Sequence, residues 1–384
     1  MTVTDPAAVI LKRPIILAAG GTGGHVFPAL AVAAELLERG QRVTLATDVR
    51  GRRFLKDALP RGLKVVVLPA GRGGGSIFAK LAGVIKAGMG LACALTWFGV
   101  QRPAMVLGFG GYPTLPPLWA AWIYGIPMAI HEANAVMGKA NISFRHRAWL
   151  VATSFAKTQG CEDIEAGRMV TTGTPVREAI AAIGAQPYPA TQGQKLKILV
   201  IGGSQGAQKL AQIVAESVMH LPLSLRQNLR IDLQAPQDFL ARAQALLRDS
   251  GVEGDVQTFF SDITERLTAC HLVIARAGAS SVAEIMTAGR PAIFVPYPHA
   301  LRDEQSANVR EAEAAGAAWV MAEASLTSES LAARLESLLG IPATLQLAAS
   351  ASRTLSHPHA ARQLADMVER LGSVRVNAQG RAST

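Results

Sequence analysis

The chain has 384 residues, of which 49% are hydrophobic and 17% are charged, and its net charge is +10. This length is sufficient for two domains with separate cores, and the composition excludes a disordered chain. The positive charge favours an acidic partner such as nucleic acid, an anionic membrane or a phosphorylated ligand, although a basic surface that maintains solubility would give the same charge. Because aromatic residues make up only 5% and the basic residues form no long run, no nucleic acid partner is expected.

The cysteines and the apolar stretches bear on the cellular compartment. The three cysteines are scattered without disulfide or metal-ligand spacing, which fits a reducing cytoplasm: Cys93, Cys161 and Cys270. The N-terminal apolar run ends at Gly20, which is too early for a signal-peptide core. The most apolar later stretch, Gly88–Val100, is shorter than the roughly 18 residues that span a bilayer. We therefore expect a soluble or peripherally bound protein.

Short apolar runs alternate with helical sequence through the first half. The first run, Ile15–Ala19, leads to a glycine-rich turn and a helix predicted over Pro28–Arg39, with a proline near its start and Gly40 at its end. Further strands are predicted at Arg42–Thr47, Lys64–Leu68, Ala104–Leu107, Met128–Ile130 and Leu150–Thr153. Strands that alternate with helices predict an α/β fold with a parallel sheet and right-handed crossovers.

The pattern pauses after Arg177, and a linker is predicted at Ile183–Gly193, which is rich in Pro, Gly, Gln and Ala. It restarts with strands predicted at Leu196–Ile201, Arg230–Gln234, Val256–Phe259, Leu272–Ala275, Ala292–Val295 and Ala317–Met321. A last helix is predicted at Ala360–Leu371, followed by a disordered tail over 372–384. These boundaries predict domains at 1–180 and 190–356, with the helix near 358–371 able to pack back on the first domain.

Two glycine-rich turns occupy equivalent positions in the two halves, Gly20–His25 and Gly202–Gly206. Glycines allow a close approach of the backbone to a ligand, and the start of the following helix favours negative charge. The pair predicts two Rossmann-like domains that face one cleft. Neither turn fits G-x-G-x-x-G, since Val26 occupies the third glycine position, and no Walker A lysine follows. A nucleotide or sugar-phosphate ligand is therefore expected, rather than a redox cofactor or ATP.

The polar residues after the strand Leu272–Ala275 form the richest stretch of the second half. A helix is predicted at Ala279–Ala288, and Ser280 and Ser281 at its start leave backbone amides free for a diphosphate. One turn further on, Glu284 can accept hydrogen bonds from a ribose diol. A solvated surface carboxylate is the alternative, but the position of Glu284 between a glycine turn and the polar cluster Asp303–Asn308 favours ligand binding.

Several blocks together resemble the MurG family, the UDP-N-acetylglucosamine:lipid-linked muramyl-pentapeptide glycosyltransferases of peptidoglycan synthesis. In chain order they are Gly20–Ala31, Gly108–Tyr112, Gly125–Pro127, His131–Asn134, Thr172–Arg177, Gly202–Gly206, Arg276–Glu284 and Asp303–Asn308. Each block occurs in other proteins, but the ordered set is specific and extends across nearly the whole chain. One departure is Ala133, where many relatives carry glutamine, and it affects the polar network beside Asn134.

The resemblance implies a GT-B glycosyltransferase fold whose second domain mainly binds the donor and whose first domain mainly binds the acceptor. It implies that Glu284 binds the ribose, Gln305 the sugar hydroxyls, and Ser204 the diphosphate with amides near Ser280 and Ser281. Arg177 is expected near the hinge and the donor. The remaining implied contacts are Phe260 and Ile263 beside the uracil, Thr22, Gly23, Gly24 and Asn134 on the donor, and Tyr112 and Asn134 on the acceptor side.

The chemistry that the resemblance implies is a single inverting displacement, because an α-linked donor gives a β-linkage. The acceptor hydroxyl must lose a proton, and His25 is the leading candidate base, with Glu132 in reserve. The alternative for His25 is that it only orders the glycine loop. Backbone amides of Gly202–Gly206 and of the helix after Gly278 would stabilise the departing diphosphate. No Asp-x-Asp pair occurs, so no metal and no cofactor are expected.

The implied substrates are UDP-N-acetylglucosamine and lipid I, and the implied location is the cytoplasmic face of the inner membrane, with further cell-wall synthesis proteins as partners. A candidate membrane contact has apolar residues at helical spacing among basic ones: Ile77, Phe78, Leu81, Val84 and Ile85, with Arg72, Lys80 and Lys86. The alternative is a crossover helix that buries this stripe in the first core.

Two other functions remain open from the sequence. A UDP-N-acetylglucosamine epimerase would share the fold and much of the donor site, but it would need carboxylates close to the sugar ring and no acceptor block. A non-catalytic UDP-sugar-binding regulator would have no use for an acceptor-side set beside a complete donor site. That set comprises His25, Tyr112, Glu132 and Asn134.

Overall fold

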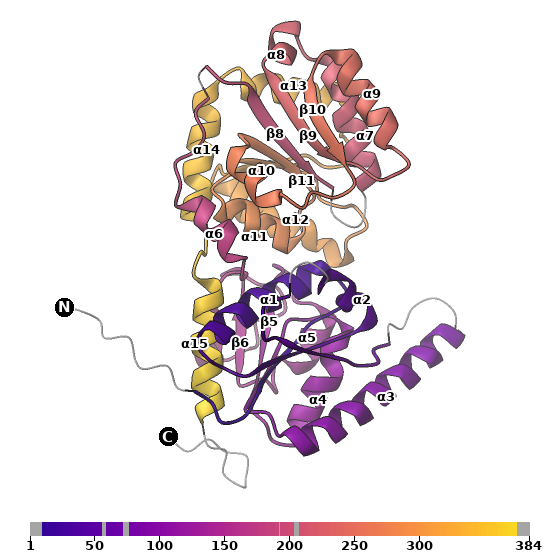
Figure 1. Ribbon diagram of the computed structural model, residues 1–384, viewed down its shortest axis with the longest axis vertical. Coiled ribbons are helices and arrows are strands. Elements are labelled where there is room, and N and C mark those ends of the chain that lie inside the picture. The colour runs from indigo at the N-terminus through magenta and orange to yellow at the C-terminus, as the bar shows by residue number, and fades with distance from the viewer. Residues whose placement is uncertain (1–9, 56–58, 72–76, 192, 203–206, 375–384) are drawn as a thin grey trace, which may run out of the picture. The chain divides into compact units, whose positions relative to one another are not determined.

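The computed structural model describes residues 10–55, 59–71, 77–191, 193–202 and 207–374. The chain forms two compact units: the first contains the residues up to Arg177 and those from His359 on, and the second is Glu178–Pro358. Each unit is built around one parallel sheet (Figure 1). The junction after Arg177 precedes the predicted linker, because helix α6 (Glu178–Gly184) buries Ile180 and Ile183 and contacts helices of the second unit.

The first sheet has the strand order β3-β2-β1-β4-β5-β6-β7, with all neighbouring strands parallel. Its strands are β1 (Ile15–Ala18), β2 (Val43–Thr47), β3 (Lys64–Val67), β4 (Met105–Gly108), β5 (Met128–Glu132), β6 (Leu150–Thr153) and β7 (Met169–Thr171). Successive strands are added toward one edge of the sheet from β1 to β3 and toward the other edge from β4 on, so the strand order reverses between β1 and β4. In open parallel sheets, ligands bind beyond the carboxyl ends of the strands at this position.

The helices of the first unit cover both faces of this sheet: α1 (Gly23–Glu38), α2 (Val49–Arg52), α3 (Ile77–Gln101), α4 (Leu115–Ile123), α5 (Lys139–Phe144) and α15 (Ala360–Ser373). The sequence predicted that this helix starts at Pro28, but α1 starts at Gly23, so that Gly23 and Gly24 form part of its first turn. His25 therefore lies in the first turn of α1 rather than in the glycine loop.

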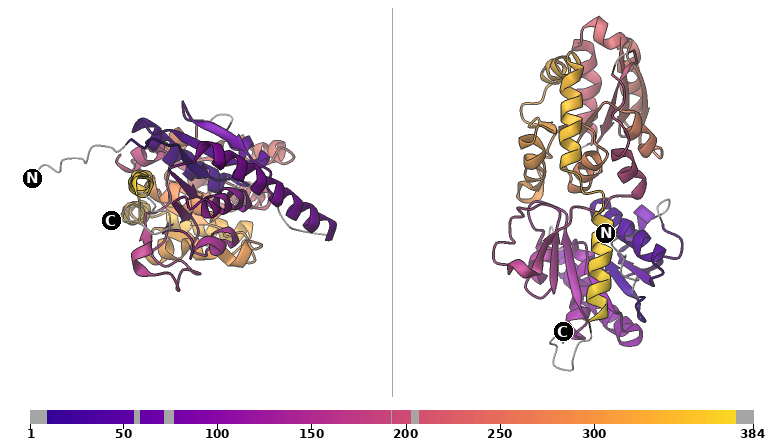
Figure 2. Two further views of the ribbon diagram at one scale, coloured as in Figure 1. Left: turned by 90° about the horizontal axis from the view of Figure 1, so that it is seen from below. Right: turned by 90° about the vertical axis from the view of Figure 1, so that its left-hand side faces the viewer.

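Helix α3 is longer than the sequence indicated. The apolar segment Leu81–Gln101 has 21 residues, which by length and composition alone is enough to cross a membrane, and 22% of an 18-residue apolar stretch within it is buried. The expectation of a short stretch at Gly88–Val100 was therefore wrong. At Gly90 the helix packs closely on the preceding segment, since a Cβ placed there would lie 2.0 Å from the carbonyl oxygen of Pro69. Figures 1 and 2 show α3 projecting beyond the neighbouring elements of the first unit.

The second sheet has the order β10-β9-β8-β11-β12-β13 and is also parallel, with its reversal between β8 and β11. Its strands are β8 (Leu196–Ile201), β9 (Leu229–Gln234), β10 (Glu253–Gln257), β11 (Leu272–Ala275), β12 (Ala292–Phe294) and β13 (Ala318–Val320). Its further helices are α7 (Ala207–Ser217), α8 (Leu223–Gln227), α9 (Leu240–Ser250), α10 (Ile263–Ala269), α11 (Ala279–Thr287), α12 (Glu304–Ala314), α13 (Ser328–Leu339) and α14 (Pro342–Thr354).

The last helix, α15, belongs to the first unit, where it packs along α1 (Figure 2). Its residues Leu364 and Val368 are buried in the same core as Leu36 of α1. The helix extends to Ser373, so the predicted start of the tail at Gly372 was two residues early, and the tail residues 375–384 lie outside the described residues.

Candidate active site

The first glycine turn lies at the carboxyl end of β1 and is held by a carboxylate that the sequence did not single out. Asp48 follows β2, is 6% exposed, and its Oδ1 accepts hydrogen bonds from the backbone N–H groups of Gly21 and Gly51 at 2.9 and 2.8 Å. A Cβ on Gly20 would lie 2.8 Å from the same oxygen. Only glycine therefore fits this turn. In the sequence, Asp48 resembles any acidic residue after a strand.

The imidazole of His25 lies against Gly110 and Gly111, which follow β4. Both glycines have left-handed backbones, with φ of +88° and +80°, and Cβ atoms there would lie 3.3 Å from Cε1 and 3.2 Å from Cδ2 of the ring. Burial lowers the pKa of His25 below its ordinary value of 6.5, although the charge of Glu132 and the backbone of Phe109 oppose this shift. The ring is thus fixed in place and favours its neutral form.

Glu132 ends β5, and both of its carboxylate oxygens are occupied. Oε1 accepts hydrogen bonds from the backbone N–H and the Nδ2 of Asn134 at 3.0 and 3.3 Å, and Oε2 accepts from Gly138 N at 2.9 Å and Asn141 Nδ2 at 2.8 Å. A carboxylate offers about four lone-pair positions. Glu132, which is 2% exposed, therefore organises the loop after β5. The buried Ala133 does not interrupt this network, because the network runs through Glu132.

His131, beside Glu132 on β5, is a further buried group that the sequence analysis gave no role. Its Nε2 lies 3.1 Å from the carbonyl oxygen of Gly173, and its ring packs on that of Phe109 with centroids 5.6 Å apart. Burial lowers the pKa of His131 to about 4. The contact fixes the segment that leads to Arg177, whose guanidinium lies 6.0 Å from the ring centroid of Phe27.

The predicted site residues of the first unit gather beyond the carboxyl ends of β1, β4 and β5. They are Thr22, Gly23, Gly24, His25, Tyr112, Glu132 and Asn134. Thr22 is the exposed N-cap of α1, and Tyr112, directly after Gly111, is 36% exposed. These residues therefore lie at the reversal of the first sheet, where ligand sites of parallel sheets occur.

In the second unit, the turn after β11 leads into α11 with Gly278 as its N-cap. Ser280, Ser281 and Glu284 are half-buried on the first two turns of this helix. Asn308 of α12 is 1% exposed and donates from Nδ2 to the carbonyl oxygen of Ala277 at 3.1 Å. This bond fixes the turn before α11 and thereby the direction of the first backbone amides of that helix. Such a helix start can bind an anion.

The segment before α12 contains unusual backbone geometry. Arg302 and Asp303 are consecutive non-glycine residues in the left-handed region, with φ of 57° and 54°. Such residues are uncommon and store strain. Gln305, in the first turn of α12, accepts a hydrogen bond on Oε1 from Tyr297 N at 2.9 Å. Gln305 is thus tied to the backbone that follows β12.

The residues predicted beside the uracil lie where β10 leads into α10. Ile263 is the first residue of α10. Phe260, however, is 3% exposed, and the guanidinium carbon of Arg266 lies 4.0 Å from the centroid of the Phe260 ring. Phe259 is instead 67% exposed. The sequence analysis missed Phe259 because it placed this residue in the strand. Ser204 lies outside the described residues.

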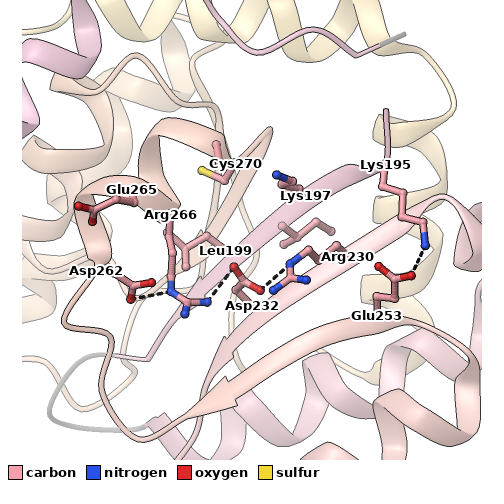
Figure 3. Close-up of a pocket in the computed structure, with 12 residues that line it drawn as sticks. Lys195, Lys197, Leu199, Arg230, Asp232, Glu253, Asp262, Glu265, Arg266 and Cys270 are labelled. Atoms are coloured by element: carbon pink, nitrogen blue, oxygen red, sulfur yellow. Dashed lines mark hydrogen bonds and ion pairs between the residues drawn. The ribbon is translucent and has the colours of Figure 1, made fainter. Parts of the chain in front are cut away.

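A cavity of about 430 Å³ lies on one face of the second sheet (Figure 3). Its charged lining is largely paired: Arg266 binds Asp232 and Asp262, each at 2.9 Å, and Lys195 binds Glu253 at 2.5 Å. The cavity lies toward the amino ends of β8 and β9. Its lining includes no residue of α11 and not Gln305, so it is distinct from the predicted nucleotide site. Among the described residues, no group of three or more His, Cys, Asp or Glu side chains is arranged to hold a metal ion.

Comparisons with known proteins agree with this arrangement. Residues 15–153 match the glycosyltransferase family 28 N-terminal domain, and residues 197–367 match the glycosyltransferase family 28 C-terminal domain. A protein of Rhodospirillum centenum is 49% identical over 356 residues, covering 92% of this chain and 93% of its own length. One of Paramagnetospirillum magneticum is 44% identical, covering 93% of this chain and 96% of its own. Both are named UDP-N-acetylglucosamine–N-acetylmuramyl-(pentapeptide) pyrophosphoryl-undecaprenol N-acetylglucosamine transferase.

Among solved structures, Acinetobacter baumannii MurG superposes with a TM-score of 0.75 and 30% identity, covering 93% of this chain and 99% of that one. A putative UDP-N-acetylglucosamine 2-epimerase of Listeria monocytogenes superposes with a TM-score of 0.68 and 14% identity, covering 92% and 95%. At that identity the likeness shows the fold alone. Both units therefore have the parallel α/β architecture of the GT-B fold.

Proposed function

Because this chain belongs to glycosyltransferase family 28 and to its MurG branch, we propose that it transfers N-acetylglucosamine from UDP-N-acetylglucosamine to lipid I. The acceptor is the 4-hydroxyl of the muramoyl sugar on undecaprenyl diphosphate, and the products are lipid II and UDP. The chain is thus a hexosyltransferase of peptidoglycan synthesis. The 49% identity over 92% of the chain carries this proposal.

The second unit binds the donor at the carboxyl ends of β8, β11 and β12. The first amides of α11, near Ser280 and Ser281, hold the diphosphate together with the glycine-rich segment Gly202–Gly206, because helix starts favour anions. Residues 203–206 of that segment lie outside the described residues. Glu284 accepts hydrogen bonds from the ribose hydroxyls, and Gln305 contacts the sugar. The exposed ring of Phe259 is better placed to border the uracil than the buried Phe260.

The first unit deprotonates the acceptor. The acceptor oxygen attacks C1 of N-acetylglucosamine from the face opposite the leaving UDP, the C1–O bond to the diphosphate breaks, and the hydroxyl proton passes to His25. A lowered pKa keeps His25 neutral near pH 7, as a general base requires. Glu132 has its lone pairs engaged by N–H groups, which supports an orienting role for it and His25 as the base.

The first unit also contacts the membrane that carries the lipid acceptor, on the cytoplasmic face. One side of α3 packs into the core through Ala94 and Phe98, so the helix lies against the unit instead of spanning a bilayer. The opposite side exposes a row of apolar residues that enters the interface: Leu81, Val84, Ile85 and Met89. The exposed Lys86 on the same helix adds attraction to anionic lipids.

Release of UDP from UDP-N-acetylglucosamine, measured with and without lipid I, tests the function. A transferase releases UDP only with the acceptor and forms lipid II in equal amount, detected by mass spectrometry. An epimerase would act on the donor without the acceptor, and a regulator would bind the donor and release nothing. Either of these results would overturn the proposal.

A further inference from the structure

One carboxylate in the second unit connects three segments that follow strands at the donor edge. Glu323 comes after β13, Arg276 directly follows β11, and Lys209 lies in the first turn of α7 after β8. Oε2 of Glu323 accepts from Arg276 Nη2 at 2.5 Å, and Oε1 accepts from Lys209 Nζ at 3.1 Å. The sequence analysis gave neither Glu323 nor Lys209 a role.

The two cations differ in how firmly they are held. The side chain of Arg276 is 5% exposed, donates from Nη1 to the carbonyl oxygen of Val295 at 3.2 Å, and lies 5.7 Å from the ring centroid of Tyr297. The side chain of Lys209 is 55% exposed and donates to Glu323 from the protein surface. Arg276 is therefore fixed, whereas the ammonium of Lys209 is accessible to a ligand.

The charges leave this cluster positive. Burial raises the pKa of Glu323, but the hydrogen bonds from Arg276 and Lys209 outweigh burial and keep the pKa below its ordinary value, so Glu323 is ionised. Two cations and one carboxylate give a net charge of +1. Lys209 is at the positive end of α7, where the helix dipole disfavours a cation. Its pairing with Glu323 offsets this cost and holds the ammonium at the edge where α7 and α11 begin.

We propose that Glu323 is a positioning residue that holds Arg276 and Lys209 ready for the diphosphate of the nucleotide-sugar donor. Arg276 and Lys209 both stay bound to Glu323, which orients their remaining N–H donors toward the phosphate oxygens. This inference rests on the proposed function, because it requires a donor diphosphate at the start of α11. It predicts that substitutions of Glu323 and Lys209 weaken the binding of ligands that carry a diphosphate and leave the binding of the nucleoside unchanged.

The test compares UDP and uridine binding by calorimetry in the full chain and in Glu323→Ala, Glu323→Gln and Lys209→Met. We expect each substitution to weaken UDP binding about tenfold, the effect of one lost charge-assisted contact, and to change uridine binding less than twofold. The double variant Glu323→Ala/Lys209→Met should lose less than the sum of the single changes, since both remove one arrangement. Glu329→Gln is the matched control, because Glu329 is 67% exposed and pairs only weakly with His220 at 3.6 Å.

Three results would overturn the inference. Equal weakening of UDP and uridine would show that Glu323 only supports the fold, and unchanged UDP affinity would show that it acts elsewhere. Lys209→Met provides the same test from an exposed position if the Glu323 variants fail to fold. Failure of the unaltered chain to bind UDP would overturn the proposed function as well, whereas normal UDP binding with insensitive variants contradicts the positioning role alone.

Discussion

Arg39 of α1 and Glu369 of α15 form an ion pair with a nitrogen–oxygen distance of 2.9 Å, although 330 residues separate them in the chain. Their side chains are 16% and 10% exposed. Arg39 also binds Asp366 at 2.6 Å and Glu35 at 2.8 Å, and Gln41 donates to Glu369 at 2.6 Å. The last helix is thus attached to the first by a polar network beside the core they share.

Arg39→Met should destabilise the first unit, because it leaves the buried carboxylate of Glu369 without its cation. We expect the free energy of unfolding to fall by about 2 kcal/mol, less than for a fully buried pair because solvent reaches part of the network. Urea denaturation followed by tryptophan fluorescence reports mainly on this unit, which contains Trp97, Trp119, Trp122 and Trp149. The exposed Arg42→Met is the control, and equal stability of both variants would contradict the prediction.

Glu284→Ala should raise the Michaelis constant for UDP-N-acetylglucosamine by about tenfold or more. Each lost hydrogen bond to a charged group contributes about 1.5–3 kcal/mol. The unaltered chain should bind UDP more tightly than 2′-deoxy-UDP, and the variant should lose this preference. The exposed Glu311→Ala on α12 should behave like the unaltered chain. If the folded Glu284 variant still prefers UDP, the ribose is held by another residue.

His25→Ala should reduce turnover at saturating substrates by about a hundredfold or more if His25 is the base. A base acts in its neutral form, so turnover should rise with pH through the pKa of His25 and level off above it. Since that pKa is lowered, the rising limb should lie below 6.5. If His25 only shapes the loop, His25→Asn should restore much of the activity. Near-normal rates and pH profiles in both variants would transfer the role to Glu132.

His131 should make the first unit less stable in acid. Its pKa is about 4 when folded and 6.5 ordinarily, so between these values the unfolded chain binds the additional proton. Stability therefore rises with pH across this window, and the contribution of His131 is present above 6.5 and lost as pH falls toward 4. Denaturation midpoints at pH 7 and 5 should differ less in His131→Gln, whose amide can still donate to Gly173. An unchanged difference would assign the acid sensitivity to other groups.

Replacing Arg72, Lys80 and Lys86 by glutamate should weaken binding to anionic vesicles. Each basic residue near such a surface contributes about 1 kcal/mol. Turnover of a short water-soluble acceptor should remain nearly intact, and the lost vesicle binding should resemble that of the unaltered chain in high salt. Lys86 is exposed on α3, whereas Arg72 lies outside the described residues. Undiminished vesicle binding would place the membrane contact on another surface.

Strands buried on both faces were predictable, because they appear in the sequence as continuous apolar runs. The predicted Leu150–Thr153, Leu196–Ile201 and Leu272–Ala275 match the observed bounds. The edge strand β10 was misplaced, since it begins with Glu253-Gly-Asp255, of which Glu253 and Gly254 are exposed. The three-residue edge strand β7 was missed altogether. These two edge strands lack the apolar run on which the prediction depended, whereas the edge strands β3 and β13 have one and were predicted.

The blocks that contain the site were predictable, but several contacts within them were not. The contact of His25 with Gly110 and Gly111 was not predicted, since these residues are far apart in the chain. The roles of Asp48 and Glu323 were not visible, because each is an isolated carboxylate whose partners come from other segments. The exposure of Phe259 and the burial of Phe260 depend on where β10 ends, and strand ends are the least certain part of such a prediction.

The return of α15 to the first unit determines which fragments of the chain contain a complete unit. The second unit is a continuous insertion, Glu178–Pro358, within a first unit whose own sequence is interrupted. A fragment that stops at Arg177 lacks the helix that buries Leu364 and Val368 against α1, and it would expose that apolar surface. A short loop joining Arg177 to His359 would instead retain all the elements of the first unit. The second unit, in contrast, is encoded by one uninterrupted segment, residues 178–358.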